Sequence, residues 1–566
     1  NNHKMILAVD TETTGPDWSH GCRPFLIIAT DGIHEWSWWG EVNKFDRSEV
    51  IWDEDDLEEI QNLLLEADEI IFHNSKFDLH MLECIGICIR GLWNKVHDTM
   101  IQSHIVCSGE SHGLKYLAYK YLEFPEDDED ELVSATEQAR SANTTWDKAR
   151  KKHPTAPGEK KGFVHADYWM VPDKCLQYGF GDVHRTLILY IVFSRYIKRK
   201  RLWDVYEERR KGIEPIYYME CQGYHVYLQE LRDDIEALKQ AREMSRRQIQ
   251  YTAKFPRYFD PKNKTDIRDL FNINLKLESP IETDKGNQSF NKEAIDILIE
   301  QNPEIVALQH LQEYNRLQTK IQYLSSYLYW EKDSYIHSNY WITGTRETRM
   351  SSEKPNLQNI DRTSRHYFGP PQGYYWIDMD LENIELAVWI YQVGNEELIQ
   401  IFESGQSVHI FIANLIPKLK EIMNRIGVKA FKELDIYIKL KGGNFAIIYG
   451  ATEKTADASY TISGAYRIVA NRFPEVPEQS NRCIQEVLDN VENSGKPYLT
   501  TLGGYPLDVD MKDLFKAPNY KIQGSAGFIM TKGRRRIYDS SDYQLSGGRM
   551  ANEVHDSLVI QQKLVG

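Results

Sequence analysis

The stretch from Tyr375 to Ala387 constrains the fold of this chain more than any other. Its apolar run Tyr375-Trp376-Ile377 ends in acidic residues, and apolar residues return from Leu386 onward. This pattern predicts a strand that carries the carboxylate of Asp380 at its end and then turns into a helix. A carboxylate in that place can hold a divalent metal, although a single Asp before a helix is more often its N-cap.

Two later segments favour the metal-binding interpretation. In Lys441–Gly450, the residues Lys441, Phe445 and Tyr449 are spaced by four, so on a helix they would share one face, and Gly450 is a suitable helix end. Such a stripe is more often core packing, but a lysine at its start is awkward for a core. The segment Glu553–Ile560 predicts two strands joined by a turn, with Asp556 at the bend.

At these three segments the sequence resembles the family A DNA polymerases, the DNA polymerase I type. Asp380 matches motif A of that family, the Lys441 segment matches motif B, and His555-Asp556 matches motif C; Thr343–Ile360 is a fourth match. The resemblance implies that Asp380 and Asp556 bind two Mg²⁺ ions, with Mn²⁺ as an alternative and the Met379 carbonyl as a further ligand. It also implies that the dNTP is contacted by Lys441, Phe445, Tyr449, His409 and Glu385. The DNA would be contacted by Arg349, Gln358, Asn359, Gln523 and His555.

Several positions depart from the family pattern. Tyr437 stands where an Arg is usual, and Lys439 would point elsewhere on a helix. Gly442-Gly443 weakens the predicted motif B helix by about 1 kcal/mol per glycine. In motif C, Ser557 stands where Glu is usual, which leaves Asp556 with one fewer acidic neighbour.

The N-terminal third contains a second set of acidic residues. Met5–Val9 predicts a buried strand, after which Asp10 and Glu12 lie on one face because strand residues two apart point the same way. Asp78 follows a second apolar strand, and Tyr178 and Asp182 are four residues apart at a predicted helix. Taken singly, each Asp is about as often a cap or turn residue.

Together these residues resemble the DEDD-type 3′–5′ exonucleases in their tyrosine-containing form. The resemblance implies that Asp10, Glu12, Asp78 and Asp182 bind two divalent metals and that Tyr178 orients the attacking water. Two such metals stabilise both the entering and the leaving oxygen of an in-line displacement.

The expected fold class is α/β and α+β, multidomain, with an RNase H-like exonuclease domain followed by a right-hand polymerase. Long helical segments are expected at 203–255 and 305–330, with a shorter one at 295–300, and the strand before the fourth match at 336–342. The insertion at 123–170 is expected to be a surface lobe with one helix near 132–150. The expected domains are the exonuclease at 1–200, the thumb at 201–334, the palm at 335–394 and 496–566, truncated at its C-terminus, and the fingers at 395–495.

Composition bounds the remaining expectations. The net charge of −16 does not exclude a DNA-binding protein, because the distribution of charge matters more than its sum. Seven scattered cysteines argue against a disulfide framework, and no apolar run approaches the length of a membrane span. We therefore expect a cytoplasmic protein without a membrane partner, in the host cytoplasm if a bacteriophage encodes it. Its expected partners are a DNA primer–template and dNTPs, with a helicase or processivity factor as a further candidate.

Two alternatives remain beside DNA synthesis with proofreading. In the first, only the nuclease is active and the C-terminal part holds DNA, because motifs B and C depart from the pattern. In the second, the chain is a single-subunit RNA polymerase. Glu385, which matches the residue that blocks a ribose 2′-hydroxyl, and the attached exonuclease argue against the second alternative.

Overall fold

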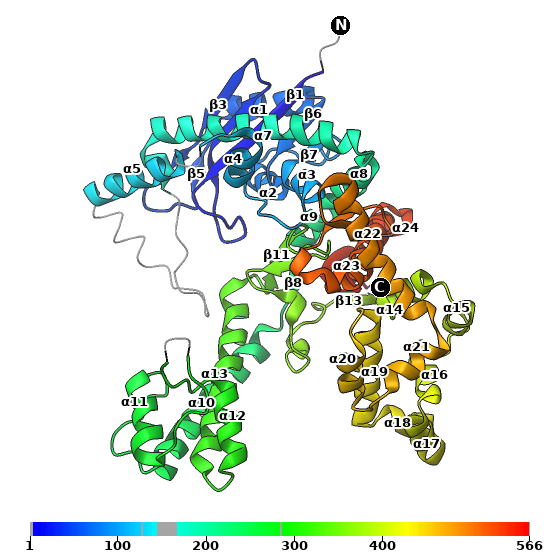
Figure 1. The fold of residues 1–566 in the computed structure, drawn as a ribbon. Helices are drawn as coiled ribbons and strands as arrows, with labels where there is room; N and C mark the ends of the chain where they lie inside the picture. Colours follow the sequence, from blue (N-terminus) through cyan, green and yellow to red (C-terminus); the bar gives the residue numbers. More distant parts are fainter. Residues whose placement is uncertain (1–3, 126–127, 144–166, 284–285, 565–566) are drawn as a thin grey trace.

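The computed structural model describes residues 4–125, 128–143, 167–283 and 286–564. In Figure 1 the N-terminal region forms an upper mass built around a sheet, and two helical arms extend below it, one containing residues 228–330 and the other residues 396–472. A small three-stranded sheet lies where the two arms meet the rest of the chain. This arrangement confirms the predicted α/β and α+β multidomain class.

The N-terminal sheet has the strand order β3-β2-β1-β6-β7. Its central strand β1 (Ile6–Thr13) pairs antiparallel with β2 and parallel with β6, with Leu7 opposite Ile70. The other strands are β2 (Pro24–Thr30), β3 (Glu35–Trp39), β6 (Glu69–Phe72) and β7 (Val96–Asp98). A separate short pair is formed by β4 (Glu41–Val42) and β5 (Val50–Ile51).

The two faces of this sheet bury different cores, because alternate strand residues point in opposite directions. Leu7 and Val9 of β1 pack in one core, whereas Ala8 packs in the other, together with Val183 and Leu187 of a long helix, α7 (Pro172–Arg199). Asp10 and Glu12 continue the face of Ala8. The alternation of β1 therefore turns both acidic residues toward α7.

The remaining helices of this region cover the sheet and its edges. The helix predicted near 132–150 within the expected insertion is present but begins earlier, since it runs from Asp128 to Ala142. Residues 144–166 lie outside the described part of the chain. The helices are α1 (Glu54–Glu66), α2 (Ser75–Cys84), α3 (Thr99–Val106), α4 (Leu114–Leu122), α5 (Asp128–Ala142) and the 3₁₀ turn Tyr168–Met170.

The expectation of one long helical segment over 203–255 was wrong. The chain forms three helices there, α8 (Trp203–Lys211), α9 (Ile213–Gln222) and α10 (Leu228–Thr252), with the short strand β8 (Tyr224–His225) between the last two. Gly223 ends α9 with a φ of 68°, a left-handed conformation that glycine adopts at little cost.

The long helix α10 packs along α13 (Val306–Trp330) to form the first arm. The predictions of helices near 295–300 and at 305–330 are confirmed. The expected strand 336–342 is interrupted after Ile336. The other elements here are α11 (Lys264–Asp269), the π-helix Leu270–Leu275, α12 (Lys292–Gln301), β9 (Glu331–Lys332), β10 (Tyr335–Ile336), β11 (Asn339–Trp341) and β12 (Ser351–Glu353).

The second arm is a cluster of helices around its own core, which includes Trp389, Phe431 and Tyr460. It follows β13 (Tyr374–Asp380) and α14 (Ile384–Val393). Its helices are α15 (Glu396–Glu403), α16 (Val408–Leu415), α17 (Pro417–Ile426), α18 (Val428–Lys432), α19 (Asp435–Ile448), α20 (Glu453–Tyr460), α21 (Ala465–Arg472) and the start of α22 (Glu475–Ser494).

The chain then returns to the centre of the molecule. There β13 pairs antiparallel with β17, and β17 with β16, to form the three-stranded sheet of the C-terminal region, which is distinct from the smaller sheet β8-β10-β9. The returning elements are β14 (Tyr498–Thr500), β15 (Pro506–Asp508), α23 (Ala517–Asp539), α24 (Ser541–Ser546), β16 (Arg549–Val554) and β17 (Ser557–Lys563).

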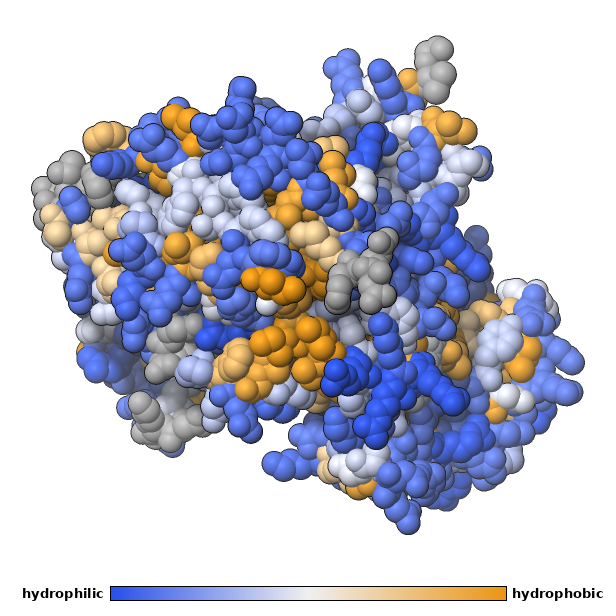
Figure 2. Space-filling view, turned by 90° about the horizontal axis from the view of Figure 1, so that it is seen from above, coloured by the Kyte–Doolittle hydropathy of each residue, from blue (hydrophilic) through white to orange (hydrophobic). Residues whose placement is uncertain are grey.

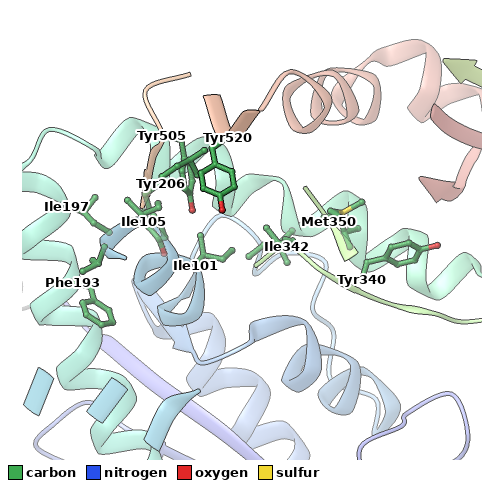
Figure 3. Close-up of a cluster of buried hydrophobic side chains, with 14 of the residues drawn as sticks. Ile101, Ile105, Phe193, Ile197, Tyr206, Tyr340, Ile342, Met350, Tyr505 and Tyr520 are labelled. Carbon is green, nitrogen blue, oxygen red and sulfur yellow. The ribbon is translucent and has the colours of Figure 1, made fainter. Parts of the chain in front are cut away.

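One hydrophobic core joins the N-terminal region to the centre of the C-terminal region. Figure 3 shows Ile101 and Ile105 of α3 and Phe193 and Ile197 of α7 in the same cluster as Tyr505. His104 of α3 is buried at this contact, where its Nδ1 lies 2.6 Å from the Tyr505 hydroxyl and its Nε2 lies 3.0 Å from the Thr345 carbonyl. The two regions are therefore packed together as parts of one interior.

One face of the molecule is mainly polar. Figure 2 shows hydrophilic side chains over most of one face, with apolar ones gathered near its middle. Within the residues that the structure describes, no helix has the length and apolarity needed to cross a membrane.

Candidate active sites

The four acidic residues predicted in the N-terminal region lie on three elements that meet at one end of the sheet. Asp10 and Glu12 are on β1, Asp78 is in the first turn of α2, and Asp182 is inside α7. Asp78 accepts hydrogen bonds from the backbone N–H of Thr11 at 3.1 Å and from its hydroxyl at 2.8 Å, which ties α2 to β1. Neither Asp78 nor Asp182 is an N-cap, since Asn74 precedes α2 and Val171 precedes α7.

A glycine allows α7 to approach the sheet. A Cβ atom on Gly179 would lie 1.8 Å from Cδ1 of Ile28 and 3.9 Å from Oε1 of Glu12. Any side chain at this position would therefore push α7, and Asp182 with it, away from β1. Tyr178, its neighbour, lies on the same helix as predicted.

Three of the four acidic side chains, Asp10, Glu12 and Asp78, have raised pKa values, chiefly because of burial and also because of their neighbouring acids. Burial, and after it the charge of Asp182, raises the pKa of Asp10 to about 7. Burial, and after it the charges of Asp10 and Asp182, raises the pKa of Glu12 well above its ordinary value. The pKa of Asp78 is raised in the same direction by burial and by Asp10. Such a group of carboxylates is stabilised by a cation placed among them.

A lysine that the sequence analysis did not single out supplies positive charge here. Lys115 of α4 forms an ion pair with Asp182, and its Nζ lies 4.0 Å from the centre of the Tyr178 ring. Arg185, one helical turn after Asp182, also contacts that carboxylate, at 3.1 Å. Arg185 was detectable from its spacing on the helix, whereas the Lys115 contact joins residues that are distant in sequence.

The chemistry of this site fits divalent metals. Carboxylate oxygens are the ligands that Mg²⁺ and Mn²⁺ prefer, and the four side chains repel one another without positive charge between them. Among the described residues, no three His, Cys, Asp or Glu side chains already stand as a formed metal-ligand group. Since Lys115 contacts Asp182, a metal bound by Asp182 would compete with this ammonium.

The second predicted pair of carboxylates meets in the three-stranded sheet. β13 and β17 are in a register that sets Asp380 opposite Ser557, the residue after Asp556, and the N–H of Leu381 donates to the carbonyl of Asp556 at 2.9 Å. Burial raises the pKa of Asp556, Asp380 raises it further, and Arg349 opposes the shift. The N-cap of α14 is Asn383, so Asp380 is not the helix cap that the sequence left open.

The hairpin that carries Asp556 is held by the pairing across its turn and by a buried contact next to the turn. Val554 pairs with Ser557 across the two-residue turn, and His555 adopts a φ of 53° in it. Glu553, just before the turn, accepts a hydrogen bond from buried Arg534 of α23 at 2.5 Å. Four predicted residues, Arg349, Gln358, His555 and Asp556, line one small cavity. Asn359 is exposed and outside that lining.

Glu385 connects two of the other predicted residues. One of its carboxylate oxygens pairs with Arg349, and the other accepts a hydrogen bond from the hydroxyl of Tyr449. Burial raises the pKa of the Tyr449 hydroxyl, and a hydrogen bond with Gln523 opposes this rise. Burial, and after it the charge of Arg349, lowers the pKa of His555.

The predicted stripe Lys441, Phe445 and Tyr449 lies on α19 and its C-terminal cap, and Gly450 ends the helix with a φ of 77°. The rings of Phe445 and Tyr449 are 5.9 Å apart between centroids. Lys441 lies 5.3 Å over the ring of Tyr437, the residue that replaces the expected Arg. Lys439 instead pairs with Asp435 at 3.0 Å, so it does not take the place of that Arg.

His409 is held against α19 by a chain of hydrogen bonds. The Tyr460 hydroxyl donates to Asn444 Oδ1 at 2.5 Å, and Asn444 Nδ2 donates to His409 Nδ1 at 2.7 Å. Because Nδ1 accepts, the proton of the neutral ring is on Nε2, which is buried and has no hydrogen-bond partner among the described residues. Burial, and after it the charge of Lys441, lowers the pKa of His409 to about 4.

The two adjacent glycines of α19 predict opposite effects on stability. A Cβ on Gly443 would lie 2.3 Å from the Tyr460 ring, whereas none of the atoms around Gly442 lies within 4 Å of a Cβ there. We expect Gly443→Ala to destabilise α19 by about 1–3 kcal/mol through overpacking. Gly442→Ala, its matched control, should stabilise the helix by about 0.5–1 kcal/mol. Hydrogen exchange of α19 amides measures both values, and equal effects would contradict the prediction.

These two sites and the folds around them define a class, a nucleic-acid polymerase joined to a nuclease. Residues 1–196 match the family model for 3′–5′ exonuclease, and residues 227–564 match the model for DNA polymerase family A. The chain belongs to DNA polymerase family A and carries an N-terminal 3′–5′ exonuclease domain. Both activities depend on metal ions in these families.

Individual relatives are distant. DNA polymerase I of Aquifex aeolicus is 23% identical over 545 residues, which cover 89% of this chain and 84% of the relative. The DNA polymerase of Mycobacterium phage L5 is 22% identical over 567 residues, covering 95% and 84%. The thermostable DNA polymerase I of Thermus aquaticus is 24% identical over 392 residues, covering 65% of this chain and 45% of the relative, so the chain spans less than half of that protein.

A solved structure supports the same fold. The POL domain of Pol1 from M. smegmatis, in a complex with DNA primer–template and dNTP, is similar with a TM-score of 0.71. The match covers 99% of this chain and 90% of that domain, at 17% identity. The shared fold thus includes the N-terminal region as well as both helical arms.

Proposed function

We propose that this chain extends a DNA primer along a DNA template with dNTPs and removes nucleotides from the primer 3′ end at its second site. The observation that carries the polymerase half is the register of β13 and β17, which brings Asp380 beside Asp556. The observation that carries the nuclease half is the grouping of Asp10, Glu12, Asp78 and Asp182, in which burial, and after it the neighbouring acids, raises the pKa values of Asp10, Glu12 and Asp78.

At the polymerase site, Asp380, Asp556 and the Met379 carbonyl would hold two Mg²⁺ ions, with Mn²⁺ as an alternative. Bound there, the ions would lower the pKa of the primer 3′-hydroxyl and neutralise charge on the triphosphate. Lys441 binds the triphosphate, and Phe445 stacks on the base or sugar of the nucleotide. Tyr449 lies by the template base.

Glu385 selects deoxynucleotides by blocking the ribose 2′-hydroxyl. Its pairing with Arg349 and Tyr449 holds the carboxylate in one place, which suits a steric role. Arg349, Gln358, Asn359, Gln523 and His555 contact the primer and template. A comparison of dNTP with rNTP incorporation tests this assignment and separates DNA synthesis from the RNA polymerase alternative.

At the nuclease site, Asp10, Glu12, Asp78 and Asp182 would hold two metal ions that activate water and stabilise the leaving oxygen. Tyr178 orients the attacking water. Burial raises the pKa of the Tyr178 hydroxyl, so it stays protonated and can donate a hydrogen bond.

His409 serves as a neutral hydrogen-bond donor to the triphosphate. We expect His409→Gln to raise the dNTP KM about tenfold or more with a smaller change in kcat, since a bond to a charged group contributes about 1.5–3 kcal/mol. Because the pKa of His409 is about 4, the ring stays neutral at neutral pH, and the KM should show no step near the ordinary histidine pKa. Steady-state KM values between about pH 6 and 8 check this.

Tyr460→Phe provides a graded comparison for His409. This change removes the hydroxyl that orients Asn444 but leaves the imidazole, so the KM should rise less than in His409→Gln. A KM step close to the ordinary histidine pKa, or a loss confined to kcat, would contradict the neutral-donor role.

We further assign residues 1–200 to the exonuclease domain, 201–334 to the thumb, 335–394 and 496–566 to the palm, and 395–495 to the fingers. The similarity to the phage L5 polymerase supports a bacteriophage origin, and with it a place in the host cytoplasm. A helicase or processivity factor is the accessory partner that this function calls for.

A primer-extension assay tests the proposal as a whole. With Mg²⁺, a matched primer–template and dNTPs, the protein should extend the primer, and without dNTPs it should shorten it. If only shortening occurs, the chain is a nuclease whose C-terminal part holds DNA.

A further inference from the structure

We propose that Asp378 gives the polymerase site the acidic side chain that motif C of this chain lacks. The family pattern has Glu where this chain has Ser557, so one negative charge is missing beside Asp556. The inference rests on the proposed polymerase function. It makes Asp378 a positioning residue that acts on the bound metals through their surroundings.

The strand register places Asp378 at the site. Asp378 and Asp380 are two residues apart on β13 and so share a face, and Ser557 pairs with Asp380 across the sheet. The Ser557 hydroxyl donates a hydrogen bond to Oδ1 of Asp378 at 2.5 Å. The serine that replaces the glutamate is therefore bonded to an acid supplied by the neighbouring strand.

The two faces of β13 have different surroundings. Met379 packs in the core that joins the two regions of the chain. Ile560, which pairs with Ile377 across the sheet, packs in the same core. On the face of Asp378, Trp376 stacks on Tyr224 with ring centroids 4.6 Å apart. Asp378 itself is exposed, as Asp380 is, so the two carboxylates reach solvent side by side on one face.

The negative charge of Asp378 matters because the carboxylates of Asp380 and Asp556 offset only part of the positive charge of two divalent ions. Groups just outside the ligands orient them and tune the affinity for metal, and their loss costs about 10–100-fold in affinity or activity. With Ser557 alone, Asp556 would lack such an acidic neighbour. Asp378 on β13 supplies the acidic side chain that the family pattern places on β17, at the position of Ser557.

A purely mechanical role is the competing explanation, in which the Ser557 bond only ties β13 to β17. Asp378→Asn separates the two, since an amide oxygen still accepts the serine hydroxyl but carries no charge. Ser557→Ala makes the opposite change, because it removes the tie and keeps the charge. The double variant D378N/S557E moves the charge back to the position of the family pattern.

The test measures metal binding directly. The protein carries Asp10→Ala and Glu12→Ala, which disable the nuclease site, and is bound to a primer–template with a dideoxy-terminated primer and the matching dNTP. Free Mn²⁺ is followed by electron paramagnetic resonance, and Mg²⁺-dependent extension is measured in parallel on an ordinary primer. We expect D378N to weaken Mn²⁺ binding about tenfold or more, S557A to weaken it less, and D378N/S557E to regain most of the loss.

Glu382→Gln is the matched control, because it removes one charge from an exposed acid in the same segment. The proposal would be overturned if D378N bound Mn²⁺ as tightly as the unsubstituted site, if E382Q lost as much Mn²⁺ affinity as D378N, or if D378N/S557E regained none of the lost affinity. If the unsubstituted site incorporates no dNTP at all, the proposed polymerase function itself fails, which is a different result.

Discussion

Replacing Asp556 by Asn is expected to abolish primer extension and to leave 3′ excision intact. Asp556 is one of the two carboxylates that meet at the end of the three-stranded sheet, and no other acid lies in its turn. Metal-based stabilisation of charge contributes several kcal/mol, so we expect a loss of at least about three orders of magnitude in kcat. Single-nucleotide incorporation under rapid mixing measures it, with excision from an unpaired 3′ end followed in the same preparation.

The amide keeps the shape of the side chain, so the fold should survive this change. Asp542→Asn is the matched control, since it makes the same change at an exposed residue of α24. Extension by D556N within a few-fold of the control rate would rule out the assignment of this site.

Asp10→Ala should have the second largest effect, this time on excision. Asp10 lies on β1 among the three other acids, where burial, and after it the charge of Asp182, raises its pKa to about 7. Without it the site loses a metal ligand, so excision should fall by about three orders of magnitude or more. Extension should survive, because Asp10 is not among the acids of the three-stranded sheet.

This prediction separates the two main hypotheses. If the C-terminal part only holds DNA, Asp10→Ala removes every activity. The release of a labelled 3′ nucleotide measures excision, and extension of a phosphorothioate-protected primer measures synthesis. Glu58→Gln, an exposed change on α1, is the control, and full excision by D10A would refute the nuclease site.

The parts of the fold that carry the sites could be predicted because local sequence determines them. β13 followed by α14, the helix α19, and the hairpin of β16 and β17 each follow from apolar periodicity and a turn signal. The face of β1 that carries Asp10 and Glu12 follows from strand alternation alone.

What could not be predicted depends on contacts between distant parts of the chain. Lys115 joins Asp182 across two helices, and Tyr460 reaches Asn444 only because Gly443 leaves room for its ring. The break between α9 and α10 depends on the pairing of β8 with β10, which lies more than 100 residues later. The sequence marked Gly442-Gly443 as a weakness of the helix, whereas the structure shows that Gly443 is needed where it stands.

The interior that α3 and α7 share with Tyr505 has a consequence for how the molecule can be divided. A fragment ending near residue 200 would lose the part of this core that lies beyond that residue, including Tyr505, and would leave buried His104 without its contacts to Tyr505 and Thr345. We expect that fragment to aggregate when expressed alone. The nuclease site and the polymerase site thus belong to one packed unit, so we expect a primer 3′ end that is used at both sites to move between them.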